Sequence, residues 1–149
     1  CPPRSSMTPE ALATIHARAF AGQGRAWSVA EFAALLDSHH VFVSKQKNAF
    51  SLGRVIADEA ELLTLATDPA TRRLGLARAA LVGFEAEAHA RGAARGFLEV
   101  AEDNAPARAL YAASQWQEIA RRAGYYRRAG GQAVDALILE KSLAPLQAW

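Results

Sequence analysis

The segment from Thr67 to Phe84, TDPATRRLGLARAALVGF, limits the possible folds more than any other part of this sequence. Asp68 and Pro69 end the apolar run before it, and the residues from Leu76 to Ala90 then follow a helical period. Because β-rich runs stand both before and after this helix, the segment predicts a crossover helix between two parallel strands of one sheet. The apolar face of the helix would consist of Ala77, Leu81, Phe84 and Ala88.

Capping residues and changes of hydrophobic period place the other elements. Thr8-Pro9-Glu10 predicts the start of a helix that runs to about Phe20. A capping box of Ser28 and Glu31 predicts a second, short helix, and Asn104 is suited to cap a later one. The order of elements predicts an α/β (α+β) domain with a single mixed, mostly antiparallel sheet flanked by helices. Strands are expected over residues 40–45, 49–56, 60–67, 96–100, 117–122 and 134–141.

Size and composition exclude several classes of protein. The chain has 149 residues, which fits one domain, and its net charge of +2 is too small to predict direct nucleic-acid binding. No apolar run reaches about 18 residues, so we expect no transmembrane helix and no membrane partner. Cys1 is the single cysteine, which excludes an internal disulfide and favours a reducing, cytoplasmic location. We interpret residues 1–6 as an extension before Met7 and expect one domain over residues 7–149.

The start of the long helix offers a site for an anion. The first N–H groups of a helix have no intrahelical partner and carry a partial positive charge. Gly75 has no Cβ to keep a phosphate away from the backbone, and Arg72 and Arg73 add positive charge. The alternative is an ordinary tight turn at Gly75 with solvated arginines, and spacing alone does not decide between the two. Neither a Walker A loop nor a complete G-x-G-x-x-G dinucleotide fingerprint is present.

Two further side chains could take part in catalysis. Glu99 stands in the apolar strand GFLEV, where it either faces solvent by alternation or points into a functional cleft. Tyr111 lies on the face of the next helix that we expect to be buried, where a core aromatic residue with a satisfied hydroxyl is the simpler interpretation. The histidines lack the spacing of metal ligands, so we expect no metal; they are His16, His39, His40 and His89.

Taken together, these segments resemble the GNAT superfamily of N-acetyltransferases, over about Thr8 to Leu143. The run from Arg72 to Ala77 is similar to the Q/R-x-x-G-x-G/A acetyl-CoA loop of that family. The run from Asn104 to Trp116 is similar to its N-x-x-A-x-x-L-Y-x-x-x-G-F segment, with Gln115-Trp116 in place of Gly-Phe. The resemblance implies the GNAT fold and acetyl-CoA as the acetyl donor.

Within the superfamily the chain resembles the RimI branch, the bacterial ribosomal-protein alanine N-acetyltransferases. Ala26-Trp27-Ser28 is similar to the P-W-S segment of that branch, and Tyr125-Tyr126 is similar to the tyrosine pair of its R-R-x-Y-Y segment. The implied acceptor is the N-terminal α-amine of a protein such as ribosomal protein S18. An α-amine with a pKa near ~7.7–8.0 is also easier to deprotonate than a lysine with a pKa near ~10.4.

The resemblance also implies roles for individual residues. Glu99 would be the general base and Tyr111 the general acid, while Trp27 and Tyr126 would bind the acceptor. The residues implied to bind acetyl-CoA are Leu65, Ala66, Thr67, Arg72, Arg73, Leu74, Gly75, Leu76, Ala77, Asn104 and Ala107.

Other functions stay open at this point. One alternative is a GNAT acetyltransferase for a lysine side chain or a small amine. Another is an acyl-CoA-binding module without turnover, which the presence of both Glu99 and Tyr111 disfavours. We expect a monomer or a weak dimer.

Overall fold

The computed structural model describes residues 8–19, 27–46, 48–68, 75–128 and 130–143. The extension over residues 1–6 and the loop residues Arg72, Arg73 and Leu74 therefore lie outside the described residues. Within the described ranges, no helix is long and apolar enough to cross a membrane. The helices are α1 (Pro9–Ala19), α2 (Val29–Leu36), α3 (Leu76–Ala90) and α4 (Ala105–Ala113). The strands are β1 (Val41–Gln46), β2 (Ala49–Ile56), β3 (Glu59–Thr67), β4 (Arg95–Ala101), β5 (Gln117–Arg127) and β6 (Ala133–Ser142).

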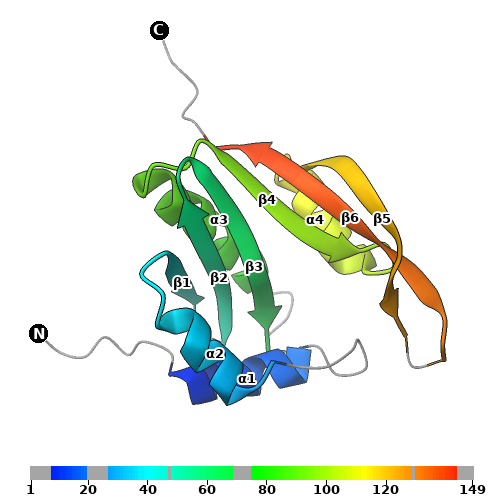
Figure 1. Cartoon of the computed structure of the whole chain (residues 1–149), viewed down its shortest axis with the longest axis horizontal. Coiled ribbons are helices and arrows are strands. Elements are labelled where there is room, and N and C mark those ends of the chain that lie inside the picture. The colour runs from blue at the N-terminus through cyan, green and yellow to red at the C-terminus, as the bar shows by residue number, and fades with distance from the viewer. Residues whose placement is uncertain (1–7, 20–26, 47, 69–74, 129, 144–149) are drawn as a thin grey trace, which may run out of the picture.

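The six strands form one sheet in the order β1-β2-β3-β4-β6-β5 (Figure 1). Every neighbouring pair is antiparallel except β3 and β4, which are parallel and are connected through α3. A parallel pair needs such a crossover, whereas antiparallel strands can be joined by short turns. The predicted crossover helix and the mixed, mostly antiparallel sheet are both confirmed.

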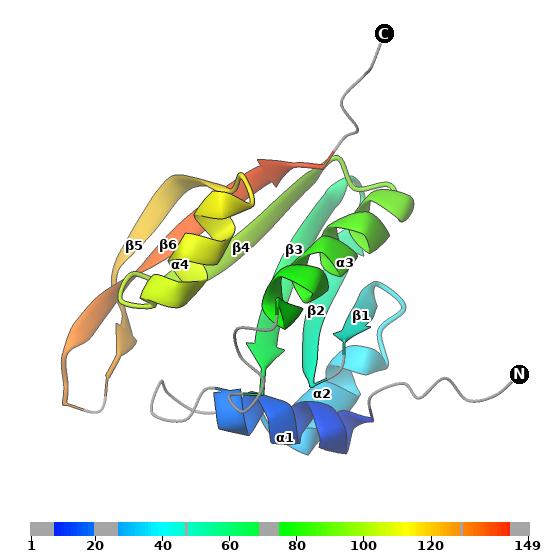
Figure 2. The same cartoon turned by 180° about the vertical axis from the view of Figure 1, so that it is seen from behind.

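Helices lie on both faces of the sheet, and each face has its own hydrophobic core. α1 and α2 lie on one face, and α3 and α4 lie on the other (Figure 1, Figure 2). In the first core Phe32 of α2 meets Phe50 of β2 edge to face, with ring centroids 5.8 Å apart. In the second core Phe84 of α3 stacks on Phe42 of β1. β1, β2 and β3 are therefore packed by helices on both faces.

Side chains cap three of the helices at the positions that the sequence indicates. The Thr8 hydroxyl accepts a hydrogen bond at the start of α1, and Ser28 and Glu31 form the capping box of α2. The side-chain oxygen of Asn104 accepts a hydrogen bond at the start of α4. These caps satisfy backbone N–H groups that a helix cannot satisfy itself.

The buried face of α3 differs in one residue from the face that the sequence predicts. Leu81, Phe84 and Ala88 are buried as expected, but Ala80 takes the place of Ala77, which is only half-buried. The buried hydroxyl of Ser51 donates to the Ala80 carbonyl at 2.8 Å, so β2 holds α3 at Ala80. The first turn of α3 is less tightly packed than this point, and that explains the partial exposure of Ala77.

β5 is longer than the sequence predicts. We expected a strand over residues 117–122, but it continues through Tyr125 and Tyr126 to Arg127. The register against β6 shifts between Arg122 and Tyr126. Gly124 makes this irregularity possible, because its φ of 60° lies in the left-handed region and its N–H donates to the Asp135 carboxylate at 2.9 Å.

Candidate active site

The parallel strands β3 and β4 pair along only part of their length. Their pairing runs from Glu59 and Arg95 to Leu62 and Leu98. Beyond this last pair β3 continues to Thr67 and β4 continues past Glu99, and the two strands diverge (Figure 1). Among the described strands, none therefore pairs with the backbone of β3 over residues 63–67 on this side. Such an edge offers hydrogen-bonding groups to an extended ligand.

A β-bulge in β3 stands at the point where the strands begin to diverge. Leu52 of β2 pairs with Thr64 and Gly53 pairs with Leu62, so Leu63 is the extra residue. A bulge bends its strand and changes which face the following side chains point to. Leu65 accordingly packs against the core under α3, and Ala66 packs against the core under α1 and α2.

A glycine is needed at position 53, where β2 runs opposite the bulge and packs against the core under α3. A Cβ at this position would lie 2.6 Å from ring atoms of Phe84 and 2.7 Å from the ring of Phe42. Neither contact is possible without moving a buried ring, because protein interiors are close-packed. A glycine opposite the bulge therefore lets α3 approach the sheet closely.

Glu99 is the first residue of β4 after its last pair with β3. Its neighbours Leu98 and Val100 are buried on the side of α3 and α4, so by alternation Glu99 points to the opposite face. Its side chain is 31% exposed, and its Oε1 lies 3.9 Å from Nη1 of Arg122 on β5. Phe97 and Ile138 line the same hollow of the surface.

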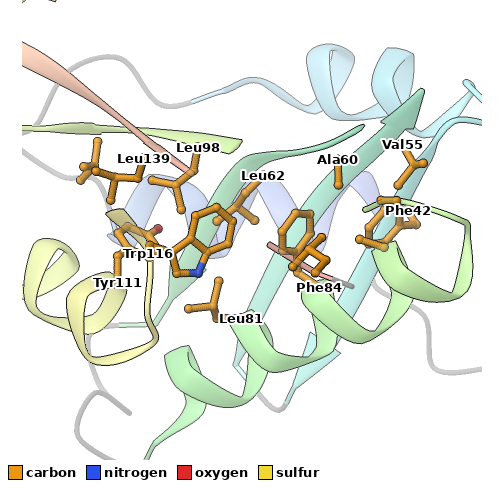
Figure 3. Close-up of a cluster of buried hydrophobic side chains, with 14 of the residues drawn as sticks. Phe42, Val55, Ala60, Leu62, Leu81, Phe84, Leu98, Tyr111, Trp116 and Leu139 are labelled. Atoms are coloured by element: carbon orange, nitrogen blue, oxygen red, sulfur yellow. The ribbon is translucent and has the colours of Figure 1, made fainter. Parts of the chain in front are cut away.

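Tyr111 lies on the other side of the sheet. It projects from α4 into the core that contains Leu98, where it meets Trp116 edge to face at 6.3 Å (Figure 3). Burial raises the pKa of the Tyr111 hydroxyl above its usual range. The phenol therefore keeps its proton at neutral pH. Glu99 and Tyr111 thus lie on opposite faces of β4, beside the point where β3 and β4 separate.

The start of α3 differs from the starts of the three other helices. Gly75 occupies the N-cap position with a φ of 73° and has no side chain to cap the helix. A Cβ at Gly75 would have no heavy atom within 4 Å, so the space around this position is open among the described residues. Leu76 and Ala77 form the first turn beyond it. The helix N-terminus is therefore suited to an anion.

Two residues on α4 that were predicted to bind acetyl-CoA also support the helix. The Asn104 side-chain oxygen accepts a hydrogen bond from the Ala107 N–H at 3.2 Å. Ala107 is half-buried against the core that contains Tyr111. These contacts fix the first turn of α4.

The two residues predicted to bind the acceptor are in different surroundings. Tyr126 lies on β5, and its pKa is raised to about 12 by burial and by the nearby charge of Glu99. Trp27 belongs to the layer of α1 and α2, where its backbone N–H donates to Nδ1 of His16 at 3.2 Å. Its ring stacks on the His16 ring at 5.1 Å. The structure therefore brings Tyr126 close to Glu99 and holds Trp27 against α1.

Charged residues next to this site were missed in the sequence. Arg122 faces Glu99, and the bidentate pair of Arg128 and Asp103 joins β5 to the turn before α4. The run RRAGYYRR makes the arginines visible in the sequence, but the irregular register of β5 conceals which carboxylate each one meets.

Strands that separate and an open helix start after the first of them are the features that the sequence resemblance implies for an acyl-CoA site, and Glu99 and Tyr111 lie beside the opening. A sequence model of the acetyltransferase (GNAT) family matches residues 11–115. The chain therefore belongs to the GNAT family of acetyltransferases, and the resemblance seen in its sequence is confirmed.

The relatives carry more specific names. The [ribosomal protein bS18]-alanine N-acetyltransferase of Escherichia coli K12 is 36% identical over 117 residues, which are 76% of this chain and 78% of that protein. The crystal structure of the ribosomal-protein-S18-alanine N-acetyltransferase from Escherichia coli has a TM-score of 0.81 and 31% identity, covering 93% of this chain and 90% of that chain. Arabidopsis thaliana NAA60 in complex with acetyl-CoA shares the fold, with a TM-score of 0.75 and 17% identity over 91% of this chain and 93% of that chain.

The residues present are compatible with acetyl-CoA. The Gly75 turn leaves room for a phosphate at the backbone, and the free edge of β3 offers backbone groups to the amide-containing arm of the coenzyme. A group of three or more side chains that could hold a metal ion does not occur among the described residues.

Proposed function

We propose that this protein transfers the acetyl group of acetyl-CoA to the N-terminal α-amine of a protein, with ribosomal protein S18 as the first candidate. The observation that carries the proposal is the separation of β3 and β4 directly after Leu62 and Leu98, with Glu99 beside it on one face and Tyr111 on the other. The names of the relatives support the choice of acceptor. A ribosomal acceptor also agrees with the cytoplasmic location favoured by the cysteine content.

Acetyl-CoA would be held by backbone groups more than by side chains. Its pyrophosphate would accept hydrogen bonds from the N–H groups at Gly75, Leu76 and Ala77, with Arg72, Arg73 and Leu74 in the loop before them. Its pantetheine arm would lie along the edge of β3 at Leu65, Ala66 and Thr67. Asn104 and Ala107 would complete the site from the start of α4.

The acceptor would approach from the face that carries Glu99. In the reaction the amine nitrogen forms a bond to the acetyl carbonyl carbon and the carbon–sulfur bond breaks. Glu99 takes the proton that the amine loses, directly or through water. Tyr126 lies on the same face and would position the acceptor near Glu99, with Trp27 on the α1–α2 side. Most of the rate acceleration would come from holding the amine in place.

Tyr111 would act on the leaving sulfur from the other face. A phenol has a pKa near ~10 and a thiol near ~8.5, so complete proton transfer to the thiolate is already uphill in water. Burial raises the pKa of Tyr111 further, which makes it a weaker acid. Tyr111 would therefore contribute mainly by donating a hydrogen bond to the developing thiolate.

The proposal is tested by measuring thiol release from acetyl-CoA with three peptides. One peptide has the S18 N-terminus with a free α-amine. The second has the same sequence with a blocked N-terminus, and the third is blocked and contains an added lysine. We expect release only with the free α-amine. Release with the lysine peptide alone would reassign the acceptor, and release with none of them would contradict an N-acetyltransferase of this kind.

A further inference from the structure

An ion pair joins the end of the β5–β6 hairpin to the turn between β4 and α4. Nε of Arg128 donates to Oδ2 of Asp103 at 2.8 Å, and its Nη2 donates to Oδ1. Two parallel hydrogen bonds of this kind fix both the distance and the orientation of the two groups. The Arg128 side chain is only 16% exposed and that of Asp103 is 46% exposed, so the pair is shielded from solvent on the arginine side.

The same guanidinium group contacts Tyr126. Its carbon lies 5.5 Å from the centre of the Tyr126 ring, in a cation–π arrangement. Tyr126 pairs with Val134 of β6, and Glu99 pairs with Ile138 of the same strand. Val134 and Ile138 are four residues apart on β6, so Tyr126 and Glu99 point to the same face. Arg128 therefore supports Tyr126 at the edge of the surface that carries Glu99.

The neighbouring arginine has different surroundings. Arg127 is exposed and forms no ion pair or hydrogen bond with the described residues through its side chain.

The backbone carbonyl of Arg128 also accepts a hydrogen bond from the Gly131 N–H, which closes the hairpin turn. Asp103 directly precedes Asn104, the cap of α4. The Asp103–Arg128 pair therefore connects two fixed points of the structure through one side-chain contact.

We propose that Asp103 and Arg128 are positioning residues for the acceptor: their pair holds Tyr126, and with it the end of the β5–β6 hairpin, in place beside Glu99. This inference rests on the proposed function. The pair lies between the β5–β6 hairpin and the turn before α4, whereas the proposed pyrophosphate and pantetheine sites are at the start of α3 and along the edge of β3. The pair should therefore control binding of the acceptor and leave binding of acetyl-CoA unchanged.

The test compares Arg128→Gln and Asp103→Asn with the matched control Arg127→Gln. Steady-state rates are measured with varied acceptor peptide and with varied acetyl-CoA. We expect each pair variant to raise the acceptor KM by about tenfold, because the charge-assisted bidentate contact that supports Tyr126 is lost. The kcat and the acetyl-CoA KM should stay within about twofold of the parent values, and Arg127→Gln should behave as the parent.

Two further variants separate positioning from general damage. Arg128→Lys keeps the positive charge but cannot form the two parallel hydrogen bonds. We expect its acceptor KM to lie between those of the parent and Arg128→Gln. The exchange Asp103→Arg with Arg128→Asp should recover part of the lost acceptor affinity. If Arg128→Gln matches Arg127→Gln, or if kcat and both KM values change together, the positioning role is wrong. If the parent protein acetylates no amine, the proposed function itself fails, and that result is distinct from both.

Discussion

The face of the sheet that carries α1 and α2 has two very different halves. Over β1, β2 and β3 the two helices seal the sheet, and Leu12, Phe32 and Phe50 have no exposed surface. Over β4, β6 and β5 none of the described helices covers this face (Figure 1). Glu99 and Tyr126 reach solvent there. We expect the covered half to contribute most to stability and the open half to receive the proposed acceptor. The boundary between them is the place where β3 and β4 separate.

The largest effect should come from the covered half. Phe50→Ala removes a fully buried ring that packs on Phe32, and it should lower the free energy of unfolding by about 3–5 kcal/mol. Urea denaturation followed by circular dichroism measures this change. A loss below about 1 kcal/mol would mean that the covered half is not the stabilising part of the sheet.

On the open half we expect a substitution to lower activity and leave stability unchanged. Glu99→Gln removes the proposed base at a partly exposed position, so kcat/KM should fall by about 10³-fold while the urea midpoint stays near that of the parent. Rates with the S18 peptide and denaturation of the same preparation give both numbers. Activity within a factor of about three of the parent would remove Glu99 from the mechanism.

Tyr111→Phe tests the face opposite to Glu99. The ring stays in its buried place against Trp116 and only the hydroxyl is lost, so the protein should fold and kcat should fall by about 10²-fold. Because the hydroxyl is proposed to bind a thiolate, a donor thioester with a better leaving group should reduce the difference between variant and parent. An unchanged kcat would show that Tyr111 is a core residue only.

Gly75→Glu tests the start of α3. The added carboxylate would lie in open space next to the proposed pyrophosphate site, and acetyl-CoA binding should weaken by about tenfold or more, as measured by calorimetry. Gly75→Gln is the matched control, because it has the same size and the same cost of a left-handed φ but carries no charge. Equal affinities for the two variants would exclude an electrostatic role for this helix start.

A further effect concerns pH and the covered half. Burial between Trp27 and Phe32 lowers the pKa of His16 from 6.5 to about 4, against an opposing contribution from Glu31. Between these values the unfolded chain binds a proton that the folded protein does not, so stability should fall as the pH falls from about 6.5 towards about 4. Urea midpoints at pH 7 and pH 5 measure this, and His16→Gln should make the difference smaller. An identical pH dependence in the variant would contradict the buried neutral His16.

Local signals explain how much of the fold could be predicted from the sequence. The caps at Ser28 and Asn104 and the period of the long helix act within a few residues, so they placed helices correctly. The crossover followed from the order of elements. The roles proposed for Glu99 and Tyr111 rest on the family resemblance, because an acidic strand residue and a buried tyrosine also have ordinary structural explanations.

The details that the sequence could not provide depend on register between distant segments. The bulge at Leu63 and the last β3–β4 pair decide where the sheet opens relative to Glu99. The shift in β5 around Gly124 decides that Arg122 meets Glu99 and that Arg128 meets Asp103. The pair of Leu62 with Leu98 and the contacts of Arg122 with Glu99 and of Arg128 with Asp103 join residues more than twenty positions apart, and no local pattern specifies them.

The most direct test of the central claim is the intact mass of ribosomal protein S18 after incubation with this protein and acetyl-CoA. Fragmentation of the product then locates the modification. We predict a gain of one acetyl group on the N-terminal residue with the parent protein, and no gain in the same time with Glu99→Gln. An acetyl group found on lysine side chains only, or an equal gain with Glu99→Gln, would contradict the proposed reaction at the opening between β3 and β4.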